Sequence, residues 1–304
     1  MKTLAGDGRR ADLLRAMPAV FVLIWSTGFV VARFGMPHAP PLTFLSWRYA
    51  LSVLAFLVWI RLTRAVWPVG RWQWLHLGVT GMLMHAGYLG GVWAAVRGGL
   101  GAGTVALMVG LQPVLTALWI NVSGHGQRVS ARQWLGLALG LAGLLLVVWQ
   151  RLGAGEVTAA NLSLAGLALL AITAGTLYQK RFVTRCDVRT ANTVQLGAAC
   201  VVSAPFAMFE AGTVELHPAL LGAMAWSVIV LTLGGSSLLY LLIQRGAATR
   251  VASLMYLVPP CTALLAWLLF SESLTLWVLA GLLLTAVGVG LVVRDHPVSK
   301  GDRQ

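Results

Sequence analysis

The sequence predicts an all-α integral membrane protein, in which ten transmembrane helices form two inverted five-helix repeats around a central cavity, with both termini in the cytoplasm. Three observations predict this fold: an apolar composition, an uneven distribution of basic residues, and a repeat at about half the chain length. Of the 304 residues, 58% are hydrophobic and only 10% are charged. Soluble domains carry about 25% charged residues, so this chain lacks the polar surface of a soluble protein.

The apolar runs are long enough to predict bilayer-crossing helices, because one crossing takes about 20 residues. Ten such runs leave room for loops and tails but for no soluble domain. The helices expected in the first half are Leu13–Ala32, Pro41–Leu62, Trp74–Val96, Thr104–Val122 and Ala131–Val148. Those expected in the second half are Leu162–Phe182, Ala191–Phe209, Leu220–Ile243, Val251–Phe270 and Leu274–Val293.

Basic residues are concentrated in every second loop. When loops are assigned to alternating sides, 18 of the 22 Lys and Arg residues fall on the side of the N-terminus. The other side holds Arg33, Arg97 and Arg151, and Arg48 lies within the second expected helix. Loops rich in Lys and Arg stay in the cytoplasm, which predicts that both termini lie there. The net charge of +13 therefore indicates membrane orientation and not a nucleic-acid partner.

The second half of the chain repeats the first at an offset of 145 to 147 residues. The pairs that carry most weight are Pro113 with Pro259, Thr116 with Thr262, Gly136 with Gly281, and Gly143 with Gly288. We place one repeat in residues 1–150 and the second, with a short cytoplasmic tail, in residues 151–304. Five is an odd number of spans, so the repeats enter the membrane in opposite orientations, an arrangement typical of secondary transporters. An inert structural duplication is the alternative.

Several short motifs occur in a familiar order, namely Trp25-Ser26-Thr27-Gly28-Phe29, Phe44-Leu45-Ser46-Trp47-Arg48-Tyr49, Leu111 to Leu118, Tyr256 to Leu264, and Glu272 before a glycine-rich last helix. This order resembles the drug/metabolite transporter superfamily, in its ten-helix branch with two EamA-type repeats. Within that branch the chain looks most like bacterial inner-membrane exporters of aromatic and neutral amino acids. One departure is His125-Gly126, where the repeat would place a counterpart of Glu272.

The resemblance implies a multi-pass transporter of the bacterial inner membrane that exports small metabolites, preferably neutral or aromatic amino acids, by alternating access. Its expected partners are a small-molecule substrate and the lipid bilayer. A broad exporter of drugs or organic cations is the rival within this class, and a membrane-embedded lipid-modifying enzyme is the rival outside it. A homodimer through the glycines of the fifth helix stays open.

The absence of several sequence motifs excludes some transport mechanisms and activities. The sequence has no Gly-x-x-x-x-Gly-Lys-Ser/Thr loop, so we expect no use of ATP. No catalytic constellation is visible, and we expect neither enzymatic activity nor a cofactor, metal site or nucleic-acid partner. All nine acidic residues lie in tails, loops or helix ends, so no carboxylate in the middle of the membrane offers a proton or sodium relay.

Polar and aromatic residues inside the apolar runs are the candidates for a cavity, since buried polar groups in a membrane normally face one another or water. Arg48 could bind a substrate carboxylate through two hydrogen bonds; its structural alternative is to hold helix-end carbonyls. The candidate substrate-binding residues are Trp25, Arg48, His85, Tyr88, Gln112, Tyr178, Tyr240 and Tyr256. The candidate gating kinks are Pro113, Pro259 and Pro260, because proline interrupts the hydrogen-bond ladder of a helix.

The basic-residue asymmetry makes a prediction about topology. Single cysteines introduced at Pro37 and Thr213 should react with an impermeant thiol reagent added to intact cells, whereas cysteines at Arg64 and Gly126 should not. The measurement is labelling before and after membrane permeabilisation. Native Cys186 provides an internal control on the cytoplasmic side, and its labelling from outside would contradict the ten-helix topology.

Overall fold

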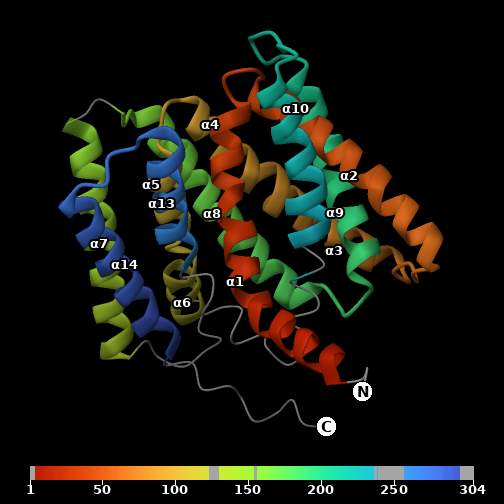
Figure 1. The fold of residues 1–304 in the computed structure, drawn as a ribbon, viewed down its shortest axis with the longest axis horizontal. Coiled ribbons are helices and arrows are strands. Elements are labelled where there is room, and N and C mark those ends of the chain that lie inside the picture. Colours follow the sequence, from red (N-terminus) through yellow and green to blue (C-terminus); the bar gives the residue numbers. More distant parts are fainter. Residues whose placement is uncertain (1–3, 123–129, 154–155, 236–237, 239–256, 295–304) are drawn as a thin grey trace.

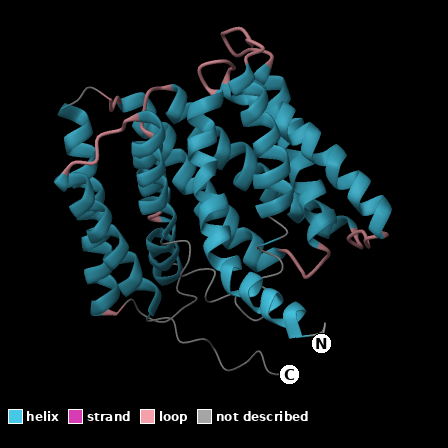
Figure 2. Ribbon diagram, viewed as in Figure 1, coloured by secondary structure: helices cyan, strands magenta, loops and turns pink. Residues whose placement is uncertain are grey.

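The computed structural model describes residues 4–122, 130–153, 156–235, 238 and 257–294. Its described part is helical throughout, with loops gathered at the two ends of the helices (Figure 2). The first repeat contains α1 (Leu4–Gly35), α2 (Pro41–Thr63), α3 (Arg71–Gly81), the π-helix η1 (Met82–Gly87), α4 (Tyr88–Arg97), α5 (Ala102–Val109), α6 (Gln112–Val122) and α7 (Ala131–Gly153). The second contains α8 (Ala159–Phe182), α9 (Val188–Ala207), α10 (Pro218–Ala225), the π-helix η2 (Trp226–Gly235), α13 (Val258–Phe270) and α14 (Leu276–Arg294).

These helices confirm the all-α membrane fold. Within the described residues, five stretches are long and apolar enough to cross a membrane, and shorter apolar helices cover 19–35, 102–116, 258–270 and 276–291. The beginning of α1 and the end of α14 lie at the same edge of the bundle (Figure 1). The total of ten crossings and the cytoplasmic placement of the termini stay predictions.

The helix starts carry local sequence signals. Pro41 occupies the first turn of α2, where its missing N–H costs nothing. Thr158 and Asn161 form a reciprocal capping box at the start of α8, which satisfies two backbone N–H groups that have no carbonyl partner within the helix. Asp187 caps α9, and hydrogen bonding from Arg189 holds the pKa of this carboxyl below its ordinary value. These caps fix the ends of helices whose interiors are too uniformly apolar to mark a boundary.

The expected fourth helix, Thr104–Val122, is divided in the structure. α5 ends at Val109 and α6 begins at Gln112; the Gly110 N–H still donates to Ala106, but the Leu111 N–H donates to Met108, only three residues back. Pro113 explains the interruption, because it has no N–H to donate to the preceding turn. Pro259 in α13 packs against Gly110, where an added Cβ would lie 2.9 Å from the proline ring. The break in one repeat therefore packs against a proline of the other.

The glycines of α7 and α14 form a reciprocal seam. The two helices lie side by side at one edge of the molecule (Figure 1). A Cβ on Gly143 would overlap the carbonyl oxygen of Gly281, and one on Gly288 would overlap that of Gly136. Gly281 and Gly288 are the repeat counterparts of Gly136 and Gly143, so this is one contact made twice, around a pseudo-two-fold axis and between antiparallel helices. The glycine face considered for a dimer is thus occupied within the chain.

A second symmetric pair is α2 with α9. Thr43 and Thr190 lie 147 residues apart and occupy the first turns of these two helices. The Thr43 hydroxyl donates to the carbonyl of Ala207 at 3.4 Å, and the Thr190 hydroxyl donates to that of Val66 at 3.0 Å. Thr43 therefore ties the start of α2 to the end of α9, and Thr190 ties the start of α9 to the loop that follows α2. Antiparallel packing of equivalent helices is what two inverted repeats require.

Two glutamates link the repeats at one edge of the bundle. The Glu210 carboxylate accepts the backbone N–H groups of Leu42 and Thr43, at 2.9 and 2.8 Å. The Glu272 carboxylate accepts the N–H of Ala102 at 3.1 Å. Both carboxylates come from the second repeat and cap helices of the first, where the positive end of the helix dipole favours an anion.

The seam predicts a sharp difference between two glycine-to-alanine changes. Gly143→Ala should lower the thermal stability of the detergent-purified protein by about 1–3 kcal/mol, the usual cost of overpacking. Gly290→Ala, on α14, is the matched control, because its Cβ would meet no atom within 4 Å. Alanine is intrinsically the better helix former, so equal or higher stability of Gly143→Ala would contradict the seam.

Candidate functional site

A cavity of about 140 Å³ lies between the two repeats. An engineered apolar cavity of about 150 Å³ holds benzene, so this space suits one aromatic ring. The cavity takes residues from α1, α2, η1, α4, α8, α9 and η2. Its lining consists of Trp25, Gly28, Phe29, Arg48, Met84, His85, Tyr88, Leu89, Val92, Trp93, Ile172, Leu196, Leu231 and Thr232.

Arg48 is the charged side chain of this lining, and it is 8% exposed. Its Nη2 donates to the Thr232 hydroxyl at 3.3 Å. Its Nε is buried and has no hydrogen-bond partner within the described part of the chain. A buried charge with unmet hydrogen bonds is costly unless a partner completes them. The structure thus holds a guanidinium in an apolar chamber with capacity for a further acceptor.

The polar contacts beside the cavity follow the repeat symmetry. Thr232 is the counterpart of His85 and Gln195 that of Arg48, both at an offset of 147. Arg48 bonds to Thr232, and the side chain of Gln195 lies beside that of His85, which it can reach as a hydrogen-bond partner. Each contact joins a π-helix of one repeat to the second helix of the other. The two pairs occupy equivalent positions but differ chemically, because Arg48 is charged whereas its counterpart Gln195 is neutral.

His85 and Thr232 both project from π-helical turns. η1 covers 82–87 and η2 covers 226–235, so at the repeat offset of 147 residues η1 falls within η2. The Thr232 hydroxyl also donates to the carbonyl of Ser227, five residues earlier, at 2.8 Å. On the other side, the Tyr49 hydroxyl donates to the backbone carbonyl of His85 at 2.9 Å. π-turns are rare and frequently mark functional positions.

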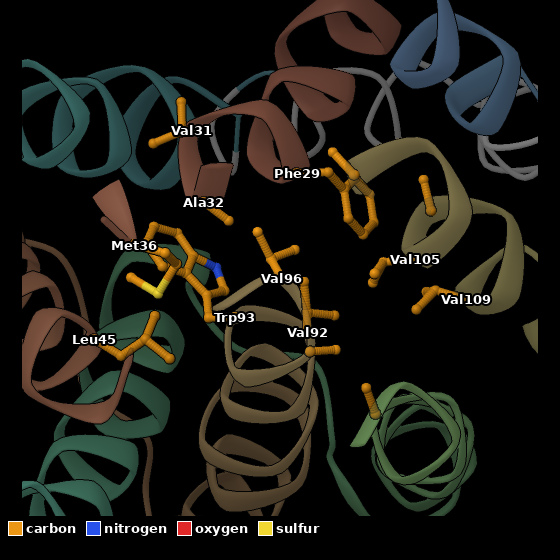
Figure 3. Close-up of a cluster of buried hydrophobic side chains, with 14 of the residues drawn as sticks. Phe29, Val31, Ala32, Met36, Leu45, Val92, Trp93, Val96, Val105 and Val109 are labelled. Atoms are coloured by element: carbon orange, nitrogen blue, oxygen red, sulfur yellow. The ribbon is translucent and has the colours of Figure 1, made fainter. Parts of the chain in front are cut away.

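Aromatic side chains form the apolar part of the cavity wall. Trp25 packs against Phe21, with ring centroids 5.4 Å apart. Trp93 is 1% exposed and stacks on Phe44 at 4.5 Å. Figure 3 shows Trp93 beside Met36 and Leu45, and Phe29, Val92 and Trp93 all line the cavity. These rings are fixed by packing, so the wall offers a planar apolar surface of defined position.

Glycines of the third predicted span bring α4 against α8. A Cβ on Gly91 would lie 2.8 Å from the carbonyl oxygen of Leu164, and one on Gly87 would lie 3.1 Å from the Cβ of Ala171. The close approach expected at these glycines is therefore made by a neighbouring helix. This packing places Tyr88 and Leu89, which sit between the two glycines, on the cavity wall.

The structure brings together four of the predicted site residues, Trp25, Arg48, His85 and Tyr88, and places two elsewhere. Gln112 donates to the Thr176 hydroxyl at 2.8 Å and is outside the cavity lining. Tyr178 is hydrogen-bonded to His76 Nδ1 at 2.8 Å, toward the end of α8, and it too is outside the lining. Tyr240 and Tyr256 lie outside the described residues.

The predicted kink residues lie away from the cavity lining. Pro113 follows the break between α5 and α6, and Pro259 and Pro260 lie in the first turn of α13. The backbone before Leu257 lies outside the described residues, so a kink in the ninth predicted helix stays a prediction. In the described residues, no three His, Cys, Asp or Glu side chains form a group able to hold a metal ion.

Thr232 and Gln195 were not among the predicted site residues. The repeat offset points to both of them, because each is the counterpart of a residue that was predicted: His85 for Thr232 and Arg48 for Gln195. Phe29 and Trp93 also line the cavity or support it, but they are two aromatic residues among many in the apolar runs. No sequence signal separates them from aromatic residues that face lipid.

Comparisons with known proteins agree with this architecture. The model of the EamA-like transporter family matches residues 16–149 and again 160–294. A probable amino-acid metabolite efflux pump of Salmonella typhimurium is 23% identical, over 93% of this chain and 95% of its own. An inner membrane transporter of Escherichia coli, YedA, is 28% identical over 92% and 91%. One crystal structure superposes with a TM-score of 0.65 at 17% identity, over 90% of this chain and 94% of its own.

The Arg48–Thr232 contact predicts a coupling between two substitutions. Thr232→Val should destabilise the purified protein by about 1–3 kcal/mol, because it leaves a buried charged group with fewer partners. In an Arg48→Met background the same change should cost less, since the guanidinium is gone. Thermal unfolding of both single variants and the double variant measures the coupling. Equal costs in the two backgrounds would show that Thr232 contributes only through Ser227.

Proposed function

The chain belongs to the EamA-like transporter family, and on that premise we propose that it exports neutral and aromatic amino acids across the bacterial inner membrane by alternating access. Membership makes it a multi-pass small-molecule transporter and not an enzyme. The observation that carries the finer proposal is the buried Arg48 guanidinium, with its unmet hydrogen-bonding capacity, in an aromatic cavity between the repeats.

Arg48 gives the cavity a site for a carboxylate. A carboxylate accepts two hydrogen bonds from one guanidinium, and such charge-assisted bonds are stronger than neutral ones. A bound carboxylate would accept a hydrogen bond from the Arg48 Nε, because Thr232 accepts only from Nη2. The side chain of the cargo would then lie against the rings of Trp25, Phe29 and Trp93, which can desolvate an aromatic or branched apolar group.

The neutral groups of the cavity set its selectivity. Tyr88 and Thr232 carry hydroxyl groups and His85 an imidazole, while the described lining carries no carboxylate. A second charge on the cargo side chain would meet no opposite charge and would cost several kcal/mol to bury. Neutral amino acids should therefore be carried well, and aspartate, glutamate and lysine poorly. The name of the Salmonella relative, an amino-acid metabolite efflux pump, agrees with this substrate class.

Alternating access requires two states of similar energy, which inverted repeats provide by exchanging conformations. The π-helices η1 and η2 are equivalent segments that face the cavity from opposite repeats. We propose that Pro113, Pro259 and Pro260 allow the helices in which they lie to bend when the protein changes between the two states. Gln112 and Tyr178 can contribute to a cargo path in the other state, outside the present cavity.

The experiment that tests this proposal is flux through proteoliposomes. Arg48→Gln should reduce phenylalanine transport by about 10- to 100-fold, the factor expected from losing a charged hydrogen bond of about 1.5–3 kcal/mol. It should affect phenylalaninamide, whose carboxamide is uncharged, much less. Arg61→Gln is the matched control, because it removes a charge from the exposed end of the same helix.

Three outcomes would count against the proposal. Equal losses for phenylalanine and its amide would show that Arg48 holds helices together and does not contact the carboxylate. Efficient lysine export would require an acidic partner that the cavity lacks. Efficient export of an organic cation without a carboxylate would favour the broad-exporter reading instead.

A further inference from the structure

The acidic residues of the described chain are all engaged or placed outside the cavity. Glu210 and Glu272 cap helices α2 and α5 at one edge of the bundle. Asp187 pairs with Arg189, and Glu215 lies 3.5 Å from His38. Glu156 belongs to the loop before α8. None of these five is a lining residue.

The other acidic residues do not change this balance. Asp7 and Asp12 lie in the first part of α1, and Asp12 precedes Trp25, the first cavity residue, by about 20 Å of helix. Residues 239–256 contain no Asp or Glu in the sequence, and Asp295 and Asp302 belong to the C-terminal tail. Among its described lining residues, the cavity therefore has one formal positive charge, on Arg48, and no negative charge to balance it.

The single positive charge of the described lining favours the carboxylate of an amino acid and disfavours its α-ammonium. A carboxylate placed on Arg48 neutralises the buried guanidinium and supplies the acceptor that Nε lacks. An α-ammonium placed in the same chamber brings a second positive charge, and its partners there are the neutral groups of His85, Tyr88 and Thr232. Removing an ammonium from water without a counter-charge is strongly unfavourable. A monoanion leaves the loaded cavity neutral, whereas a zwitterion leaves it positive.

We propose that aromatic monocarboxylates without an amino group, of the 3-phenylpropanoate type, are cargo of this cavity and occupy it more tightly than the matching amino acid. The proposal rests on the proposed function, because it uses the same cavity and the same role for Arg48. The cavity volume of about 140 Å³ and the rings of Trp25 and Phe29 suit a single phenyl group. The substrate class is then defined by one carboxylate and one aromatic ring, with the amino group tolerated and not recognised.

The test compares three ligands that share one phenyl group. 3-Phenylpropanoate has the carboxylate alone, phenylalanine has both charged groups, and phenethylamine has the ammonium alone. Dissociation constants are measured by isothermal titration calorimetry on the purified full-length protein at pH 8, where the carboxylates are ionised. We expect 3-phenylpropanoate to bind about tenfold or more tightly than phenylalanine, a difference of about 1.4 kcal/mol, and phenethylamine to bind weakest.

Variants identify the group that reads the carboxylate. Arg48→Gln should remove the preference for 3-phenylpropanoate over phenethylamine, while Arg61→Gln on the same helix should retain it. Counterflow of radiolabelled 3-phenylpropanoate in proteoliposomes, compared with protein-free liposomes, checks that the bound acid is also carried. Saturable counterflow that Arg48→Gln abolishes would support the proposal.

The outcomes separate this inference from the function on which it rests. If phenylalanine binds and is exported but 3-phenylpropanoate binds more weakly, the inference is overturned and amino-acid export stands. If phenethylamine binds as well as phenylalanine, the aromatic rings hold the ammonium and the charge argument is wrong. If neither phenylalanine nor 3-phenylpropanoate is bound or carried, the proposed function fails together with the inference.

Discussion

A guanidinium that is buried with too few partners is the constraint around which this protein is organised. Arg48 is fixed on α2 and bonds to Thr232 of η2 in the second repeat, and it shares the cavity lining with His85 of η1 in the first. Tyr49, the next residue on α2, ties that helix to the backbone of His85. In an apolar medium such contacts cannot be replaced by water, so the relative position of the repeats and the position of the charge depend on each other.

Irregular backbone occurs in this bundle where protein covers it. A bilayer cannot satisfy free N–H and C=O groups, so departures from the α-helix survive only against other helices or a cavity. η1 and η2 face the cavity, and the break at Gly110 lies against Pro259. The π-helices and the break between α5 and α6 both lie next to the other repeat. The segments best able to change conformation are therefore those at which the two halves meet.

The sequence predicted the fold well because bilayer crossing imposes length and composition directly, and because the repeat offset pairs positions without any knowledge of packing. The offset matched Gly136 with Gly281 and Gly143 with Gly288, which the structure places in one seam. Rotation of each helix about its own axis was not predictable. On α2, Trp47 is exposed and its neighbour Arg48 is buried, yet the helix is apolar on all sides and offers no periodicity from which to choose a face. Tyr178 and Gln112 were assigned to the cavity for this reason.

One pair of equivalent residues in the glycine seam between α7 and α14 bears on how the two repeats diverged. Gly140 and Thr285 lie 145 residues apart, like the glycine pairs on either side of them, so they are one position seen in two repeats. They face each other, and the Thr285 hydroxyl donates to the Gly140 carbonyl at 3.4 Å. In a dimer of identical halves, this position would hold the same residue twice, because an isologous interface repeats every residue. Once the repeat was encoded twice, one copy could gain the hydroxyl while the other kept the space to receive it.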